Sequence, residues 1–354
     1  MSTTEEPTLR NYVRRFRDDR GWSQQELADR TGLSRTGIGA IESGRLVPST
    51  SAALALAAAF GCKVEDVFVL EADVDSSRWA WPPAKVPSRF WTAQGLSGKL
   101  LYPVEPNPLG LVAHDGIFQE DRLELHTEQD PRSTIVVASC DPAVGLLADE
   151  YQRQTGYRML CLGRSSREAL DLLRDDVVHA AGIHVADHTH LDDNAHYGQH
   201  ALNRPFYLLH VAEWLEGLSS SETVTAGAMS PAQLKRKRWV AREEGAAARK
   251  LFDEYTDSKV RPVFTAYDHR GVAAAIKRGI ADIGVSLKLV SDESGLGFYT
   301  LREAMYDLCI DARLVEDPRM QALIKVVQST QYSRALRELP GYNTQNTGLL
   351  RSLP

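Results

Sequence analysis

The feature that most limits the folds open to this sequence is a pair of short helix signals joined by a glycine, within Gln24–Gly44. Ser23 and Glu26 have the spacing of a capping box, which starts a helix that Gly32 ends. Ser34 has the position of a cap for a second helix directly afterwards. Two short helices that meet at a glycine turn predict a helix-turn-helix, the arrangement that places its second helix in the major groove of DNA.

Further helix signals on both sides extend this motif to an all-α, five-helix domain over residues 1–70. Ile38 and Ile41 provide the inner face of the second helix of the motif, which Gly44 ends. The flanking segments predict a first helix that carries Leu9, Val13 and Phe16 and ends near Gly21, a long helix that starts at Ser49 or Thr50 after Pro48, and a short last helix over Val64–Phe68.

The segment QQELADRTGLSRTGIGAIESG, Gln24–Gly44, closely resembles the Xre (lambda-repressor-like) family of DNA-binding regulators. The resemblance covers about residues 8–70 and implies that the domain binds double-stranded DNA. By their positions in the motif, the residues expected to contact DNA are Gln24, Ser34, Arg35, Thr36, Ala40, Ser43 and Arg45.

The expected contacts divide between phosphates and bases. Gln24 would donate to a phosphate, as would Ser43 and Arg45 beyond the helix, whereas Arg35 would contact guanine with two hydrogen bonds. Thr36 and Ala40 would touch a thymine methyl group or shape the fit.

Gly37 and Gly39 depart from what a base-contacting helix needs. Each costs about 1 kcal/mol relative to alanine inside a helix and presents no side chain to a base. We therefore expect few base contacts. The alternative to DNA binding is a helical bundle that serves only as a protein-interaction module.

Composition indicates a multi-domain intracellular protein. The 354 residues exceed what one core usually supports, with 43% apolar and 25% charged residues. We expect a cytoplasmic protein with no membrane segment, because the start lacks a signal peptide and the longest apolar run, Ala52–Phe60, is too short to span a bilayer.

A net charge of −6 requires that any DNA binding come from a local surface. The four cysteines are far apart and predict neither a zinc site nor a disulfide framework.

After Leu70 the helical pattern stops, and residues 71–130 are expected to be a linker with a short β segment. Prolines recur too often there for long helices, and Phe90–His114 alternates enough for one or two hairpins. The aromatic residues Trp79, Trp81 and Trp91 would form either a binding groove or, as we favour, a layer that is buried between domains.

From Ser133 strand and helix signals alternate, which predicts an α/β domain over residues 131–354 with a parallel-rich sheet covered on both faces. The expected strands are Thr134–Ala138, Tyr157–Leu162, Val177–His184, Lys237–Val240, Val260–Thr265, Asp282–Leu287, Gly297–Leu301 and Met305–Ile310.

Ligands of such sheets bind beyond the carboxyl ends of strands, at the starts of helices. Small and polar residues stand at four such places, with no GxGxxG or Walker loop among them. This pattern predicts a clamp for a small, anionic molecule, and the residues expected to line it are Ser139 and Cys140, Ser165 and Ser166, Arg242 with Gly245 and Ala246, and His269.

Six segments of this domain resemble, in order, the periplasmic-binding-protein-like domain that is similar to molybdate- and tungstate-binding proteins; among them are SCDPAVGLLADEY, REEGAAARKLFDEY and GYNTQNTG. The resemblance spans about residues 131–350 and implies two lobes of type II topology. Lobe one would hold about 131–210 and 305–354, and lobe two about 211–304, with hinge strands near Tyr207–Trp214 and Tyr299–Ile310. It also adds Tyr306 to the residues that would face the ligand.

Two features leave the ligand open. Glu243 and Glu244 stand beside a helix start, where a carboxylate repels a dianion, so a zwitterion or a hydroxylated organic acid is an alternative to an oxyanion. Ser139, Ser165 and Ser166 would also serve as ordinary helix caps, with or without ligand contact.

Six of the ten histidines fall within His179–His200. The spacing of four between His184 and His188, and between His196 and His200, suits a metal pair on a helix. Asp192, Asp193, Asn194 and Gly198 favour a turn, so we expect a solvated loop and no metal site.

These observations favour a transcription regulator that is not an enzyme, needs no cofactor, and acts as a homodimer on two DNA half-sites. Closure of the two lobes around a small-molecule effector would change the spacing of the DNA-binding heads. One alternative is a metal-responsive regulator or an enzyme that uses the histidine-rich segment. The other is a constitutive DNA-binding protein whose C-terminal domain only oligomerises.

Overall fold

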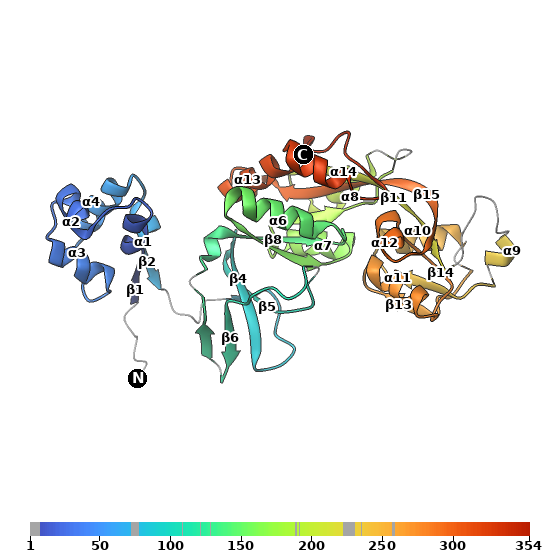
Figure 1. Cartoon of the computed structure of the whole chain (residues 1–354), viewed down its shortest axis with the longest axis horizontal. Coiled ribbons are helices and arrows are strands. Elements are labelled where there is room, and N and C mark those ends of the chain that lie inside the picture. The colour runs from blue at the N-terminus through green and yellow to red at the C-terminus, as the bar shows by residue number, and fades with distance from the viewer. Residues whose placement is uncertain are drawn as a thin grey trace. The chain divides into compact units, whose positions relative to one another are not determined.

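The computed structural model describes residues 8–71, 78–107, 109–120, 122–127, 129–187, 190, 192–221, 231–234, 236–256 and 259–354. They divide into two compact units, Met1–Arg78 and Trp79–Pro354 (Figure 1). Each unit has its own apolar core. Among the described residues, no helix has the length and apolar character that crossing a membrane requires.

The first unit contains the expected helices, which pack around a core that includes Val13, Leu27, Ile38, Leu56 and Phe60. The helices are α1 Val13–Asp18, α2 Gln24–Thr31, α3 Arg35–Glu42, α4 Thr50–Phe60 and α5 Val64–Val67.

The predicted caps of the helix-turn-helix are confirmed. Ser23 and Glu26 form a reciprocal capping box at the start of α2, and Gly32 ends it in the left-handed conformation. The Ser34 hydroxyl accepts the main-chain N–H of Gly37 at 3.0 Å at the start of α3.

The predicted position of Leu9 in the first helix was wrong, because Leu9 lies in a strand. β1 (Thr8–Asn11) pairs antiparallel with β2 (Phe68–Glu71), and Leu9 lies opposite Leu70. The ladder pairs main-chain groups of two segments about sixty residues apart, and helical spacing within one segment gives no sign of such a partner. Leu9 still packs against the core of the first unit.

The stretch expected to be a linker forms a sheet of five strands in its described residues, and it belongs to the second unit. β4 pairs antiparallel with β5 and β6, and β6 pairs antiparallel with β7. The strands are β3 Arg78–Trp79, β4 Ser88–Gly95, β5 Gly98–Pro103, β6 Gly116–Gln119 and β7 Arg122–Leu125.

This five-stranded sheet packs on the α/β part of the second unit, as the docking interpretation of its aromatic residues expected. Trp91 and Tyr102 are fully buried in one cluster with Val136 and Leu160 of the α/β part. Their burial removes large apolar surfaces from water on both sides of the contact. The second unit therefore begins near Trp79 and not at residue 131.

Polar groups fix the same contact. Arg158 donates to both carboxylate oxygens of Asp115, at 2.6 and 2.8 Å, and also to the Thr92 carbonyl. Nearby, His179 Nδ1 accepts the N–H of Val136 at 3.0 Å, and its Nε2 donates to the Gln94 carbonyl at 2.9 Å. Buried donors and acceptors are thus paired across the contact.

The α/β part is built on one mixed sheet of ten strands among the described residues. The main order is β13-β12-β14-β11-β15-β10-β8-β9, and β16 and β17 pair with β11. The strands are β8 Thr134–Ser139, β9 Arg158–Gly163, β10 Ala180–Ile183, β11 Phe206–Ser220, β12 Trp239–Arg242, β13 Phe264–Ala266, β14 Ile283–Leu287, β15 Gly297–Asp311, β16 Tyr342–Asn343 and β17 Leu350–Leu353.

Helices cover both ends of this sheet and define two lobes with separate cores. α6 and α7 accompany β8 and β9, whereas α10 and α11 pack on β12 and β14. The helices are α6 Val144–Thr155, α7 Ser166–Arg174, α8 Asp193–Leu202, α9 Pro231–Leu234, α10 Ala247–Tyr255, α11 His269–Lys277, α12 Lys288–Glu293, α13 Pro318–Val327 and α14 Thr330–Arg337.

β11 and β15 connect the lobes, because each runs through both of them (Figure 1). They pair antiparallel from Phe206 opposite Asp311 to Ser220 opposite Gly297. Both expected hinge segments lie on these strands. The separate strands expected at Gly297–Leu301 and Met305–Ile310 are one continuous strand, since pairing with β11 extends through the residues between them.

The prediction of a solvated loop for the histidine-rich segment, His179–His200, was also wrong for the second half of that segment. Asp193–Leu202 forms the helix α8. Asn194, which favoured a turn, accepts the main-chain N–H groups of Val185 and Ala186 and donates to Asp307. The side chain therefore satisfies tertiary partners and does not compete with the helix. His188 lies outside the described residues.

We predict that Asp115→Ala strongly destabilises the second unit. The Arg158 and Asp115 side chains are only 14% and 2% exposed, so the variant leaves a guanidinium largely buried without its carboxylate. We expect a loss of about 3–5 kcal/mol in the free energy of unfolding, measured by denaturant titration. Asp171→Ala, which breaks the exposed pair with Arg174, is the matched control and should leave stability nearly unchanged. Equal effects of the two variants would contradict the anchoring role.

We also predict that His179 makes stability depend on pH. Burial, with a smaller effect of the Arg319 guanidinium, lowers the pKa of folded His179 to about 4, whereas an unfolded histidine has a pKa of about 6.5. The unfolded chain therefore binds the additional proton between these values. This group's contribution to stability is complete above pH 6.5 and falls by up to about 1.4 kcal/mol per pH unit as the pH drops toward 4.

Chemical denaturation at a series of pH values measures this slope. His179→Gln should reduce the slope of unfolding free energy against pH by up to about 1.4 kcal/mol per pH unit, which corresponds to one proton. An unchanged slope in a folded variant would show that His179 is not buried in the neutral form.

Candidate functional site

The first candidate surface is the exposed side of α3. Arg35, Thr36 and Ser43 are exposed, and Ala40 is half-buried, so the predicted DNA-contacting residues lie on an accessible face. Ile38 and Ile41 face the core on the opposite side. Among the described residues, Arg35 makes no hydrogen bond or ion pair, which leaves its guanidinium available to a base.

The remaining predicted DNA contacts are partly engaged within the domain. Gln24 donates its amide to the Glu42 carboxylate at 2.9 Å. An amide group has two hydrogens, so one remains for a phosphate. Arg45 donates to the Ser43 hydroxyl at 2.9 Å, which places these two side chains together just after α3. Their contact with DNA remains a prediction.

The second candidate site lies between the two lobes of the α/β part, at the end of β8, which β10 separates from β15 in the sheet. The Ser139 and Tyr306 hydroxyls are 2.6 Å apart, and the Tyr306 ring stacks on Trp214 with ring centroids 4.6 Å apart. Gly182 makes this approach possible, since a Cβ there would lie 2.4 Å from the Tyr306 hydroxyl oxygen. The structure thus brings together two predicted residues from opposite ends of the second domain.

His184 extends this cluster from the end of β10. Its Nδ1 is 3.3 Å from both the Cys140 sulfur and the Ser166 hydroxyl. Its ring centroid is 5.2 Å from that of Trp214 on β11 and 6.1 Å from that of His269 on α11. Three predicted residues, Cys140, Ser166 and His269, therefore surround a histidine that was considered only as a metal ligand.

Several ring nitrogens in this cluster are buried without a partner. They are His184 Nε2, Trp214 Nε1 and both nitrogens of His269. The three side chains are only about 1% exposed. Buried polar atoms are nearly always hydrogen-bonded in proteins, so such a group of exceptions makes this cluster the candidate place for an additional molecule.

Burial keeps these histidines neutral. It lowers the pKa of His184 to about 3, and the Arg302 and Arg242 guanidinium groups add to the effect. Burial also lowers the pKa of His269 well below its usual value, with smaller effects of Arg242 and His184. In the same way, burial raises the pKa of the Cys140 thiol to about 12. The cluster therefore offers neutral hydrogen-bonding groups and no thiolate.

Arg242, the predicted cationic contact, is paired within the protein. Its guanidinium donates to both carboxylate oxygens of Glu243 at 2.8 Å and to the Tyr267 carbonyl at 3.1 Å. The side chain is 1% exposed. Glu243 therefore neutralises Arg242, and the carboxylate that weakened the oxyanion interpretation faces a cation of its own chain.

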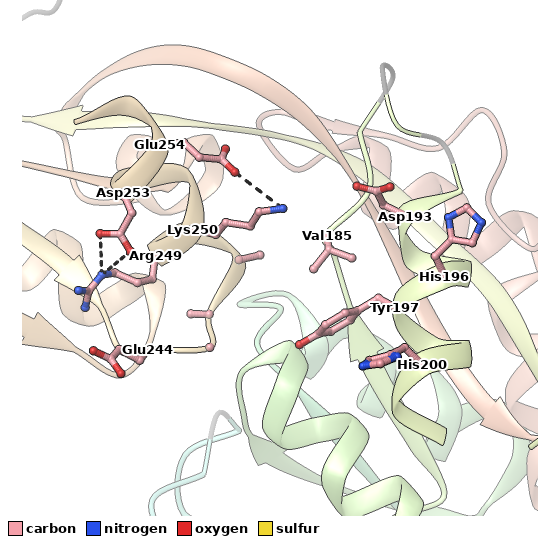
Figure 2. Close-up of a pocket in the computed structure, with 13 residues that line it drawn as sticks. Val185, Asp193, His196, Tyr197, His200, Glu244, Arg249, Lys250, Asp253 and Glu254 are labelled. Atoms are coloured by element: carbon pink, nitrogen blue, oxygen red, sulfur yellow. Dashed lines mark hydrogen bonds and ion pairs between the residues drawn. The ribbon is translucent and has the colours of Figure 1, made fainter. Parts of the chain in front are cut away.

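A pocket of about 890 Å³ lies between α8 of one lobe and α10 of the other (Figure 2). Figure 2 shows Tyr197 and His200 of α8 on one side and Lys250 and Glu254 of α10 on the other, with Val185 between them. The predicted residues Gly245 and Ala246 line this pocket. They therefore belong to an outer opening, and none of the buried ring nitrogens above belongs to a residue that lines it.

Ser165 serves as a helix cap. Its hydroxyl accepts the main-chain N–H of Glu168, and the Glu168 carboxylate accepts the main-chain N–H of Ser165. Its neighbour Ser166 points to His184 instead. Of the two serines, only Ser166 joins the cluster.

The described residues contain no group of three or more side chains suited to hold a metal ion. His196 and His200 are one turn apart on α8 and line the outer pocket, while His179 is a buried structural residue. The histidine-rich segment therefore supplies residues to three different environments.

Sequence reasoning missed two residues of the cluster: Trp214, and His184, which was considered only as a metal ligand. His184 is the last residue of the expected strand Val177–His184 and directly follows β10 in the structure, and this position at a strand end was the available signal. Trp214 lies within β11, and only its pairing with β15 places the indole beside Tyr306.

Comparisons with known proteins agree with the identification of a helix-turn-helix in the first unit. A family model described as helix-turn-helix matches residues 13–67. YgzD of Bacillus subtilis (strain 168), named as an uncharacterized HTH-type transcriptional regulator, is 43% identical over 63 residues, which cover 18% of this chain and 96% of that protein.

The second unit also has relatives. The uncharacterized protein YvgK of Bacillus subtilis (strain 168) is 24% identical over 231 residues, covering 62% of this chain and 74% of that protein. The solved structure of PhnD1 from Prochlorococcus marinus in complex with methylphosphonate matches with 12% identity and a TM-score of 0.44, covering 60% of this chain and 92% of that one. This level of similarity says nothing about the ligand.

The family model described as PBP superfamily domain matches residues 148–328, just over half of the chain. The chain belongs to the PBP superfamily, and with its N-terminal helix-turn-helix domain it is a transcription regulator fused to a periplasmic-binding-protein-like ligand-binding domain.

Proposed function

We propose that this protein regulates transcription in response to a small ligand held between the lobes, at the cluster of His184, Trp214 and His269. The observation that carries the proposal is the set of buried ring nitrogens without partners. A ligand that accepts hydrogen bonds from them would remove the cost of leaving them unpaired, which is about 1–3 kcal/mol for each group.

The proposed ligand is a small oxyanion, such as molybdate or tungstate, or a small organic acid. Oxygen acceptors of such molecules complement N–H donors of imidazole and indole rings and the hydroxyls of Ser139 and Ser166. The start of α7 lies beside this group, and the main-chain N–H groups of a helix start favour negative charge.

Lobe closure is the proposed link to DNA. Ser166 and His184 come from one lobe, His269 comes from the other, and Trp214 lies on a connecting strand. A ligand that contacts all of them binds the closed arrangement more tightly than an open one, and so shifts the population toward it. In a cytoplasmic homodimer, this change would alter the spacing of two DNA-binding heads on their half-sites.

We predict that Trp214→Phe weakens ligand binding about tenfold while the protein remains folded. Phenylalanine retains a ring for stacking on Tyr306 but lacks the Nε1 hydrogen. One lost hydrogen bond of about 1.4 kcal/mol corresponds to this factor. Thermal-shift titration with molybdate, tungstate, lactate and malate measures the change.

Trp239→Phe is the matched control, because the Trp239 indole already donates to the Leu234 carbonyl at 2.9 Å. That variant should lower stability without changing the affinity. If none of the four ligands stabilises the unsubstituted protein, the proposed ligand class is wrong. If Trp214→Phe binds as tightly as the unsubstituted protein, the cluster is not the binding site.

We predict that replacing Arg35 and Thr36 together by alanine removes sequence-specific DNA binding. Loss of a guanine contact with two hydrogen bonds costs about 1–3 kcal/mol, or roughly tenfold to a hundredfold in affinity. Binding to a duplex selected from random sequences with the full chain, measured at physiological salt, tests this expectation.

Arg334→Ala removes one positive charge from an 84% exposed side chain in the second unit and serves as the control. It should leave the affinity nearly unchanged. Retained specific binding by the Arg35 and Thr36 variant would refute recognition by α3. The same titration gives the number of chains on each duplex, for which we expect two.

A further inference from the structure

The buried ring nitrogens of the interlobe cluster differ in what they offer to a ligand. The Ser166 hydroxyl accepts the main-chain N–H of His184 at 3.4 Å, so its own hydrogen is available for His184 Nδ1. With Ser166 as the donor to Nδ1, the ring proton of His184 lies on Nε2, which is then a donor without a partner. Trp214 Nε1 is also a donor without a partner.

His269 adds an acceptor to these donors. A neutral imidazole has one N–H and one nitrogen lone pair, and both nitrogens of His269 are buried without a partner. The main chain of His269 is held in place by two interactions. Its carbonyl accepts the Ser286 hydroxyl, and the residue before it, Asp268, caps the start of α11. The cluster thus presents N–H donors and one imidazole lone pair.

The charges around His269 oppose its protonation in the absence of a ligand. Burial disfavours a positive charge on the ring most strongly, and Arg242 of β12 and His184, which follows β10, disfavour it further. The nearby carboxylates are committed elsewhere, because Glu243 pairs with Arg242, Asp268 accepts the main-chain N–H of Gly271, and Glu216 pairs with Arg302. The lone pair of His269 therefore remains unprotonated in the ligand-free site.

We propose, resting on the proposed function, that His269 selects ligands that bring a proton of their own: a protonated oxyanion or a hydroxy acid in preference to an oxyanion without a proton. The hydroxyl of such a ligand donates to the His269 lone pair, while its other oxygens accept from His184 and Trp214. An oxyanion without a proton instead directs an oxygen lone pair at the nitrogen lone pair. It pairs both ring nitrogens of His269 only if the ring takes one proton from solvent.

Inorganic phosphate and sulfate are the matched probes for the full-length protein, because both are tetrahedral and only phosphate carries a proton at about pH 7.5. We expect phosphate to bind at least about tenfold more tightly than sulfate at this pH. We also expect sulfate binding to take up one proton, so that its dissociation constant rises about tenfold for each unit of pH. Calorimetry in two buffers of different ionisation enthalpy measures the uptake directly.

His269→Asn separates selection by the side chain from a general effect of pH. Asparagine retains a donor and an acceptor but takes up no proton, so the variant should retain phosphate binding and lose proton-linked sulfate binding. His196→Asn, a change of an exposed histidine on α8, should leave both unchanged. Circular dichroism confirms that each variant is folded.

If sulfate binds as tightly as phosphate and without proton uptake, the proposed role of His269 is wrong. The proposal that a ligand binds between the lobes is not affected by this result. Proton uptake that persists in His269→Asn also overturns the role of His269. Absence of binding of every probe, namely phosphate, sulfate, molybdate, tungstate, lactate and malate, refutes the ligand class of the proposed function, and the inference with it.

Discussion

The pairing of β11 with β15 is the constraint on which the second unit depends. Each strand has fifteen residues, and their ladder passes through both lobes without a break in the chain. A rotation of one lobe against the other must therefore bend this ladder. Its register shifts between His210 and Ala212 and between Glu216 and Gly217, and such irregularities locally bend and twist a strand. Trp214 lies between the two shifts, so its indole is carried by a segment with an irregularity on each side.

Two kinds of buried histidine occur in the second unit of this protein. His179 is buried with both nitrogens paired, and it fastens the five-stranded sheet to the lobe beside it. His184 and His269 are buried as deeply but retain unpaired nitrogens where the lobes meet. A protein gains nothing in stability from such atoms, since desolvation without a partner costs free energy. Their cost is explained if a ligand completes the site.

The helix-turn-helix could be predicted closely from sequence because its determinants are local. Ser23 and Ser34 satisfy N–H groups three residues away, and Gly32 ends a helix through its own backbone conformation. The order of strands and helices after Ser133 follows for a similar reason, since each apolar run contains its own periodicity. Ser139, Ser166 and His269 were expected at the ligand site from the rule that ligands bind beyond strand ends.

The sequence by itself determined the local elements, their order, and the helix starts from which most of the cluster is drawn. Only the tertiary structure decided the pairing of Leu9 with Leu70, the docking of residues 78–125 on the α/β part, the helix α8, and the partners of His184 and Trp214. The physical reason is the range of the interactions. A cap or an apolar period acts within a few residues, whereas ladder pairing, burial and the absence of a hydrogen-bond partner are properties of segments brought together from distant parts of the chain.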